Sequence, residues 1–208
     1  MSKPGAYTRA DVVETALSIL DEFGLADLSM RRLAGVLDVQ PSALYWHVSN
    51  KQTLLGLVSD QIIERAAAVN RDDFVHADAL DWKALTLAEA NAIRDALLAY
   101  RDGAEVVSST LALGLGAGDA LTRIRAGIDA ACAEDADLAR VTAESILFLV
   151  LGQVWHEQQR MQADSMGLVS ADQATKPEDA GNASDSGFGI ELILDGLEKK
   201  LTLKHGSR

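Results

Sequence analysis

The stretch from Ser29 to Lys51 constrains the fold of this chain most, because its pattern predicts two short helices joined by a tight turn. Leu33, Ala34 and Leu37 recur at helical spacing and give the first helix one apolar face. The Ser29 side chain can accept a hydrogen bond from a backbone N–H that has no partner within that helix. The stretch therefore predicts a small helix with a defined start and one side to bury.

The turn and the second helix follow from the next residues. Asp38 stands at the turn, where Asp tolerates a left-handed backbone better than most residues. Pro41 suits the first turn of a helix that extends to about His47, since its missing N–H would have no partner there. Val39 and Leu44 can face the first helix, which leaves four residues outside: Gln40, Ser42, Tyr45 and His47. This arrangement predicts a helix-turn-helix whose polar face can enter a DNA major groove.

The rest of the chain also has helical periodicity, which predicts an all-α fold. Thr8 can cap a helix that ends at about Phe23, before Gly24, and Asn50 can cap a helix over 50–70. Further helices are predicted over 81–100, 119–133, from Asp135 or Asp137 to about 162, and 189–203. Between them we expect a frayed start at 1–7, a polar break at 71–81, an ambiguous glycine-interrupted segment at 104–118 and a mobile loop at 163–186.

Composition and length narrow the class of protein. Hydrophobic residues make up 48% of the 208 residues, which is ample for a buried core. Cys132 is the single cysteine, so an internal disulfide is excluded and a reducing compartment is expected. The N-terminal residues lack an apolar signal core, and the longest apolar run, Ile146–Leu151, is far too short for a membrane span. We therefore expect a soluble cytoplasmic protein with no membrane partner.

The charge distribution is uneven. The formal net charge is −12, although DNA contact favours positive charge. The segment 29–51 carries three basic residues and one acid, which gives +2, so the other 185 residues carry 16 basic and 30 acidic residues, which gives −14. A cationic head on an anionic body would orient the head towards phosphate. The alternative is that the acidic residues only keep the protein soluble.

The last two long helices expose more apolar surface than a small bundle can cover. Pairing with a second copy would bury both faces in a four-helix interface. A dimer would also place two reading heads on a palindromic DNA site. The alternative is that both helices are packed inside a monomer.

Enzymatic chemistry has little support in the sequence. The four histidines, which are His47, His76, His156 and His205, form no metal-spaced pair. The glycine-rich segment at 114–120 lacks the spacing and the lysine of phosphate-binding loops. We expect no catalytic residues, no metal site and no cofactor.

Three segments carry a resemblance to the tetracycline repressor family. LSMRRLAGVLDVQPSALYWHVSNKQTLL resembles the DNA-binding signature of that family, and ALLAYRDGAEV resembles the middle of the tetracycline repressors. GIELILDGLEKKL resembles their final dimerisation helix. Asp38 is a departure, because the family usually has glycine there. The resemblance implies a DNA-binding domain over 1–50, a connector helix over 51–70, and a ligand-binding and dimerisation domain over 71–208.

The resemblance also implies roles for residues of the head. Arg31 matches a position that reaches a guanine edge, for which a bidentate contact contributes about 1–3 kcal/mol of discrimination. Base-reading positions correspond to Gln40, Pro41, Ser42 and Ala43. Phosphate-contacting positions correspond to Tyr45, His47 and Lys51, and Ser29 completes the expected DNA-binding set. Trp46 is expected to pack the head and flank the DNA backbone, whereas a buried aromatic pair is the alternative for Tyr45 and Trp46.

For the effector the family pattern is only partly retained. Tetracycline repressors bind a magnesium–drug chelate with a histidine, and the matching residue here is Val107, which cannot ligate a metal. The resemblance implies a pocket lined by Ala67, Glu89, Ile93, Val107, Thr110, Arg123, Trp155 and His156. Mostly apolar walls favour a planar or aromatic small molecule other than tetracycline. The alternative for His156 and Glu157 is an interface network with Arg160.

These observations lead to one functional expectation. The chain should be a homodimeric, ligand-responsive transcriptional regulator, most simply a repressor that a small molecule releases from double-stranded operator DNA. The ligand would act only through its preference for one of two states. The alternative is a small-molecule-binding helical protein with little specific DNA binding.

Overall fold

The computed structural model describes residues 7–76, 79–165 and 183–206, and within them the fold is all-α apart from one small hairpin. The elements are α1 (Arg9–Phe23), α2 (Met30–Val36), α3 (Pro41–Leu44), α4 (Lys51–Glu64), a 3-10 helix (Arg71–Phe74), β1 (Val75–His76), β2 (Ala79–Leu80), α5 (Trp82–Leu98), α6 (Gly103–Ala112), α7 (Gly118–Ala131), α8 (Ala136–Ser165) and α9 (Ala183–Gly206). The predicted fold class is therefore confirmed.

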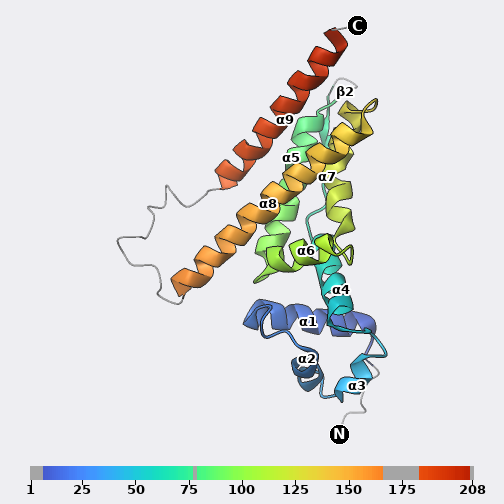
Figure 1. Cartoon of the computed structure of the whole chain (residues 1–208), viewed down its shortest axis with the longest axis vertical. Helices are drawn as coiled ribbons and strands as arrows, with labels where there is room; N and C mark the ends of the chain where they lie inside the picture. Colours follow the sequence, from blue (N-terminus) through green and yellow to red (C-terminus); the bar gives the residue numbers. More distant parts are fainter. Residues whose placement is uncertain (1–6, 77–78, 166–182, 207–208) are drawn as a thin grey trace. The chain divides into compact units, whose positions relative to one another are not determined.

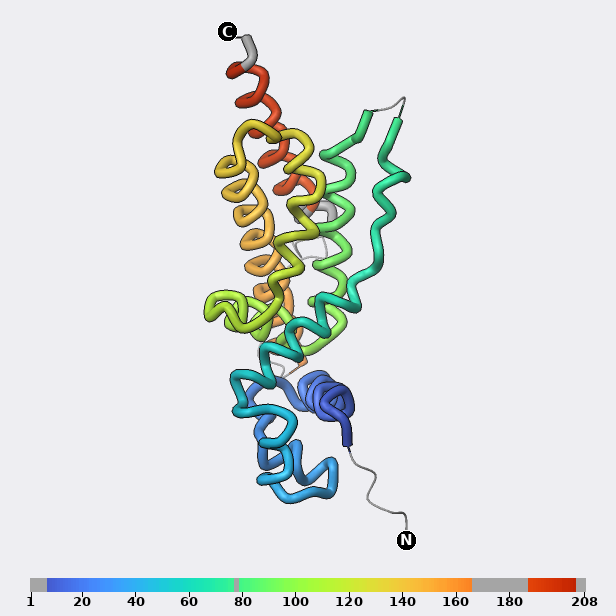
Figure 2. The backbone as a smooth tube through the Cα atoms, turned by 90° about the vertical axis from the view of Figure 1, so that its right-hand side faces the viewer, coloured from blue at the N-terminus to red at the C-terminus, as the bar shows by residue number. Residues whose placement is uncertain are grey.

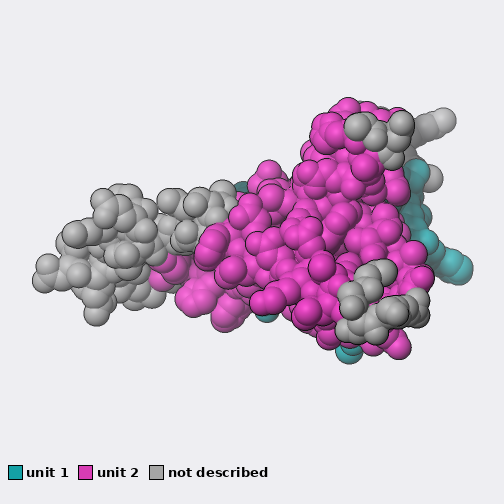
Figure 3. Space-filling view, turned by 90° about the horizontal axis from the view of Figure 1, so that it is seen from above, with its two compact units in different colours: residues 1–65, 96–118 teal, residues 66–95, 119–208 magenta. Residues whose placement is uncertain are grey.

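The chain divides into two compact units, which Figure 3 distinguishes by colour. Unit 1 contains residues 1–65 and 96–118, and unit 2 contains residues 66–95 and 119–208. Segment 96–118, from the middle of the sequence, thus belongs with the N-terminal helices. The functional boundary expected near residue 70 stays a prediction, because compactness does not assign functions to segments.

Unit 1 begins with a three-helix head formed by α1, α2 and α3 (Figure 1). Thr8 and Asp11 form a reciprocal capping box at the start of α1, and Gly24 ends this helix with a φ of 84°. One face of α1 is buried by Val12, Val13, Ala16, Leu17, Ile19 and Leu20. These caps and this apolar stripe agree with the sequence prediction, because both depend only on neighbours along the helix.

Helix α4 packs closely against α6 and the segment that follows it, all within unit 1. A Cβ added to Gly56 would lie 2.4 Å from the Leu115 carbonyl oxygen, and one added to Gly116 would lie 2.5 Å from the Gly56 carbonyl oxygen. Glycine at both positions lets the two backbones approach directly. The Asp60 carboxylate then accepts the Ala117 N–H at 2.7 Å, where Ala117 has a φ of 61°.

Unit 2 contains the first fourteen residues of α5, most of α7, and all of the described parts of α8 and α9. Helices α8 and α9 pack side by side (Figure 2). Helices α5 and α7 approach closely, since a Cβ on Gly127 would lie 2.4 Å from the Thr86 hydroxyl and 2.6 Å from the Trp82 carbonyl oxygen.

Two lysines attach α9 to the rest of unit 2. Lys83 of α5 forms ion pairs with Asp195 and Glu198 of α9. Lys204, near the end of α9, forms an ion pair with Asp135, the residue before α8. Helix α9 is therefore connected by charge to two different elements of its unit.

Several predicted boundaries were wrong. Helix α4 ends at Glu64 rather than near residue 70, and α3 ends at Leu44 rather than at His47. The polar break at 71–81 contains the antiparallel hairpin, in which Val75 pairs with Leu80. The ambiguous segment at 104–118 is mostly α6, and α8 includes residues 163–165 of the expected loop. The rest of that loop, to residue 182, and residues 1–6 lie outside the described residues.

Helix α8 is the one helix of the described segments that is long and apolar enough to cross a membrane by length and composition. Of its most apolar stretch, 44% is buried inside the protein. The buried side chains include Ile146, Leu147, Val150 and Val154, which lie on one face. Burial of one face against the rest of unit 2 is typical of the core helix of a helical domain.

Candidate DNA-binding and effector-binding sites

The helix-turn-helix has the local geometry that its sequence predicts. The Ser29 hydroxyl accepts the Arg32 N–H at 3.2 Å and caps α2. Asp38 has a φ of 54°, so the turn uses a left-handed residue, and the Val39 N–H then donates to the Ala34 carbonyl oxygen at 3.0 Å. Leu33 and Leu44 are buried between α2 and α3. The turn therefore holds α3 with one apolar side inward and its other side free.

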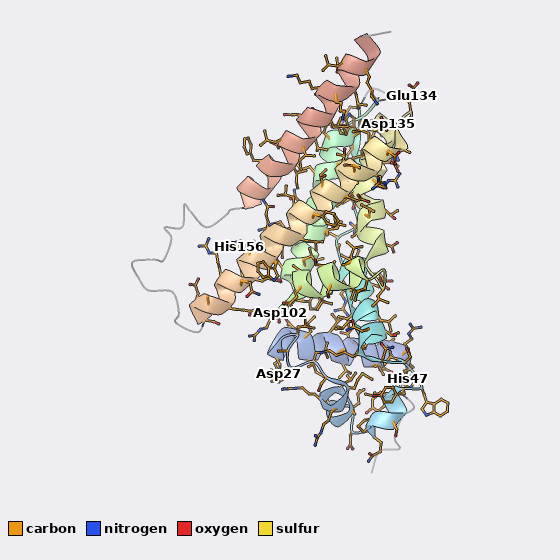
Figure 4. The ribbon with its side chains drawn as sticks, in the orientation of Figure 1. Asp27, His47, Asp102, Glu134, Asp135 and His156 are labelled. Carbon is orange, nitrogen blue, oxygen red and sulfur yellow. The ribbon has the colours of Figure 1, made fainter. Side chains whose placement is uncertain are left out.

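The outward side of α3 carries the residues expected to read DNA. Gln40, Pro41 and Ser42 are exposed, and Ala43 is half-buried. Tyr45 is 54% exposed, so the alternative of a buried aromatic pair is wrong. His47 and Lys51 are half-buried at the edge of the same surface; Figure 4 labels His47 beyond α3. The structure thus places the predicted DNA-binding set on and beside one exposed helix, and its contacts with DNA stay a prediction.

Trp46 differs from the expectation that it packs the head. Its side chain is 90% exposed, although indole is among the largest apolar groups. The reason is the short length of α3: Leu44 already fills the inward position, and Tyr45 and Trp46 come after the last helical residue. An indole left in solvent beside a polar reading surface is a group available to a partner.

The two adjacent arginines of α2 have different environments. Arg32 donates to the Asp27 carboxylate at 2.7 Å, and its guanidinium lies 3.7 Å from the centre of the Phe23 ring. Arg31 is exposed. Arg32 therefore acts within the head, whereas a contact of the exposed Arg31 with DNA stays a prediction.

In unit 2, three of the predicted effector-binding residues are brought together by one guanidinium. Arg123 of α7 donates through Nε to the Glu89 carboxylate of α5 at 2.7 Å. Its Nη2 donates to the Ala67 carbonyl oxygen at 2.7 Å, and its Nη1 to the Ala66 carbonyl oxygen at 3.3 Å. Ile93 follows Glu89 by one helical turn and is fully buried. Ala67, Glu89, Ile93 and Arg123 therefore form one neighbourhood.

Val107 and Thr110 belong to unit 1 and are completely buried. The Thr110 hydroxyl lies 2.8 Å from the Ser59 hydroxyl and 2.8 Å from the Val106 carbonyl oxygen. Thr110 thus has a structural role between α6 and α4. A contact of either residue with an effector stays a prediction.

Trp155 and His156 lie on the exposed side of α8, where their rings meet edge to face at 6.3 Å between centroids. His156 projects outward from α8 (Figure 4). The neighbouring Glu157 accepts from Arg94 of α5 at 2.7 Å. Glu157 therefore joins two helices of the same unit, whereas Trp155 and His156 face outward.

Arg94 is a buried charge that the sequence analysis did not single out. It is 8% exposed and reaches Glu157 across the interior of unit 2. A single arginine within the apolar stretch of α5 was the available signal, since such a charge needs a partner when it is buried. Across the described residues, no group of three or more His, Cys, Asp or Glu side chains could hold a metal ion.

The outer faces of α8 and α9 leave large apolar side chains exposed. On α8 three of these side chains recur at a spacing of seven residues, and α9 carries three more: Val141, Phe148, Trp155, Phe188, Leu192 and Leu203. Several large apolar side chains exposed on two adjacent helices are typical of a protein–protein interface.

Comparison with known protein families identifies the family of this chain. The model of the tetracyclin repressor-like C-terminal domain matches residues 76–201, which is more than half of the chain. The chain belongs to the tetracycline repressor family. It is a transcriptional regulator of that family, and its unit 2 falls almost wholly within, or next to, the matched domain.

Individual members of the tetracycline repressor family match along nearly the whole chain. The tetracycline repressor protein class C of Escherichia coli is 34% identical over 206 residues, which is 92% of this chain and 90% of the repressor. The crystal structure of Mycobacterium smegmatis BioQ is 37% identical, with a TM-score of 0.76 over 92% of this chain and 97% of BioQ. A TetR variant from Acinetobacter baumannii AYE, solved with minocycline, is 28% identical, with a TM-score of 0.70 over 93% and 97% of the two chains.

Proposed function

We propose that this regulator is a homodimeric repressor that binds a palindromic operator and leaves it when a small molecule binds. The observation that carries the proposal is the reading surface on and next to α3, where Gln40, Ser42, Tyr45 and Trp46 are all exposed. Polar and aromatic side chains on one exposed surface can contact base edges and the sugar–phosphate backbone. A BioQ structure that contains its natural double-stranded DNA operator has a TM-score of 0.73 to this chain, which supports the same use of the head.

A second copy of this chain is the expected occupant of the apolar faces of α8 and α9. These helices belong to unit 2 and pack against each other, and each of them has large apolar side chains that are exposed. Two copies related by a two-fold axis would bury this surface against itself. The same axis would place two heads on the two halves of a palindrome.

The effector is proposed to bind near Ala67, Glu89, Ile93 and Arg123. Ala67 and Ile93 are the apolar residues of this neighbourhood, and Glu89 and Arg123 form one ion pair within it. Val107 stands where the resemblance places a metal-ligating histidine, so a magnesium–tetracycline chelate would lack that ligand. We therefore propose a planar or aromatic, largely apolar small molecule other than tetracycline. As in any two-state regulator, it would act by binding one state more tightly than the other.

The test of DNA binding is Arg31→Ala, with Arg71→Ala as its matched control on an exposed 3-10 helix. The probe is a duplex that the wild-type protein selects from a random pool. We expect Arg31→Ala to weaken specific binding by about tenfold or more, which corresponds to loss of a bidentate base contact. Arg71→Ala should bind as the wild type does. Equal affinity of the Arg31→Ala and wild-type proteins in a gel-shift assay would contradict a role of Arg31 in reading the operator.

Salt dependence separates the proposal from its alternative, a helical protein that binds small molecules but has little specific DNA binding. A repressor that contacts several phosphates loses affinity steeply as salt rises. We expect the logarithm of the binding constant to fall linearly with the logarithm of salt concentration. A slope near zero would favour the alternative. A cytoplasmic location and the lack of catalysis belong to the same proposal, since an operator-binding repressor needs access to DNA and no turnover.

A further inference from the structure

The chain that leaves α4 is held by a residue from a distant part of the sequence. Helix α4 ends at Glu64 with Arg65 as its cap, and the next two carbonyl groups are those of Ala66 and Ala67. Both carbonyl oxygens accept from the Arg123 guanidinium, at 3.3 Å and 2.7 Å. Arg123 and these two alanines all belong to unit 2, which begins at Ala66 on this side of the chain.

Electrostatics favours an arginine at this place. The Ala66 and Ala67 carbonyls lie just beyond the cap of α4, next to the partial negative charge that the carboxyl end of a helix carries. The last turn of α4 contains no basic residue, and the guanidinium of its cap, Arg65, is already bound to Glu14 and Tyr100. A guanidinium has five N–H groups in one plane, which lets it bind successive carbonyl groups and a carboxylate at the same time.

The position of Arg123 is fixed by the packing of α5 against α7. Gly127, one turn beyond Arg123, sits directly against the Trp82 carbonyl and Thr86 of α5. This close approach brings Arg123 opposite Glu89, which lies one turn beyond Thr86. Glu89 is 7% exposed, and its carboxylate accepts the Nε–H of Arg123 at 2.7 Å. The buried carboxylate therefore orients the guanidinium, whose Nη1 and Nη2 donate to the carbonyl oxygens of Ala66 and Ala67, the residues that follow the cap of α4.

We propose that Arg123 is a positioning residue for operator binding, which holds the end of α4 through the Ala66 and Ala67 carbonyls. Helix α4 packs against α1 of the reading head within unit 1, so fraying of the last turn of α4 would weaken the support of the head. The contact lies among the proposed effector-binding residues Ala67 and Glu89, so a bound molecule there would change it directly. This inference rests on the proposed function, because operator affinity is one of its readouts.

The first experiment compares Arg123→Met with Arg125→Met. Arg125 lies two residues further along α7 and bonds to Asp129 of the same helix, so it controls for the loss of an arginine and its ion pair. Operator affinity is measured with the selected duplex at fixed salt, and hydrogen exchange is followed in peptides that cover residues 60–70. We expect Arg123→Met to weaken binding about fivefold to tenfold and to speed exchange at 64–68. Arg125→Met should change neither.

The second variant, Arg123→Lys, keeps the proposal testable if Arg123→Met fails to fold. A lysine can still pair with Glu89, but a single ammonium group cannot donate to two successive carbonyls and a carboxylate in one plane. We expect a melting temperature close to that of the wild type, together with faster exchange at 64–68 and weaker operator binding. A purely structural role would change the melting temperature and the exchange rates of the whole unit together.

The outcomes distinguish the two levels of inference. If wild-type protein selects no duplex with salt-dependent affinity, the proposed function fails. If wild-type binding is normal and Arg123→Lys matches it in both affinity and exchange, the positioning role of Arg123 is overturned while the proposed function stands.

Discussion

The carboxylate of Asp102 accepts the backbone N–H of Leu25 at 2.8 Å and thereby ties the corner between α5 and α6 to the end of α1. Asp102 itself is left-handed, with a φ of 56°. A Cβ added to Gly24 would lie 2.8 Å from the same carboxylate, so glycine at this position serves both the positive φ of 84° and the close approach. Arg65 reinforces the connection, because it donates to Glu14 and Tyr100 within unit 1.

Substitutions of Asp102 should separate strain from hydrogen bonding. Asn tolerates the left-handed backbone and keeps an acceptor, so Asp102→Asn should be nearly as stable as the wild type. Asp102→Gly loses the acceptor but removes strain, for a net cost of about 1 kcal/mol. Asp102→Ala loses the acceptor and keeps the strain, for a cost of about 2 kcal/mol. Urea unfolding at one protein concentration measures the order, and a Gly variant less stable than the Ala variant would contradict it.

The buried hydroxyl pair of Ser59 and Thr110 should show strong coupling. Both residues are completely buried and their oxygens are 2.8 Å apart. Thr110→Val should cost about 1–3 kcal/mol, because it leaves the Ser59 hydroxyl without that partner. The double variant with Ser59→Ala should recover part of the loss, since neither polar group then remains. Additive effects in the double-mutant cycle would show that the pair contributes no energy of its own.

Trp46→Ala should leave stability unchanged and weaken DNA binding. The indole is 90% exposed, so its removal should change the free energy of unfolding by no more than about 0.5 kcal/mol. Loss of an aromatic contact beside the reading surface should lower operator affinity by about threefold to tenfold, or roughly 1 kcal/mol. Thermal unfolding and fluorescence anisotropy measure the two quantities. A large fall in melting temperature would mean that Trp46 packs the head after all.

The contact of Lys204 with Asp135 should make the attachment of α9 dependent on pH. The Lys204 ammonium and then the Leu138 N–H lower the pKa of the Asp135 carboxyl in the folded protein. A lowered folded pKa means that the stabilisation is fully present above the unfolded pKa of about 3.9 and is lost as pH falls through the folded value. Lys204→Met should therefore be less stable than the wild type near pH 7.

The acidic range provides the decisive comparison for this ion pair. As Asp135 becomes protonated, the difference between the wild type and Lys204→Met in urea unfolding should disappear. Lys199→Met, which alters an exposed lysine of the same helix, is the control at both pH values. A difference that persists unchanged once the carboxyl is protonated would assign the effect to the lysine side chain's packing instead of to its charge.

Local features of the fold were predictable from the sequence. Thr8, Ser29 and Asn50 cap the helices that they were expected to cap, and Asp38 is left-handed at the turn. Asp135, one of two alternatives, is the residue that caps α8. All of these features depend on backbone groups within about four residues, so the residue types and their spacing carry the information.

Some local predictions failed because neighbours from elsewhere in the chain decided the outcome. The helix expected to reach residue 70 ends at Glu64, although Ala66–Ala68 are good helix formers. Arg65, the cap, donates to Glu14, and Arg123 donates to the Ala67 carbonyl oxygen just beyond it. Helical propensity contains no information about such contacts. Trp46 was expected to pack inward because indole is apolar, but Leu44 already occupies the inward position of the short α3.

The sequence by itself determined that this chain forms amphipathic helices and where most of them begin. It also determined that two of these helices form a helix-turn-helix. Those properties follow from periodicity and caps, which act over a few residues. Only the tertiary structure decided that Arg123 meets Glu89 and Ala67, that Asp102 meets Leu25, and that Lys204 meets Asp135. The partners in these pairs are 34, 56, 77 and 69 residues apart, and their contact depends on the packing register of whole helices.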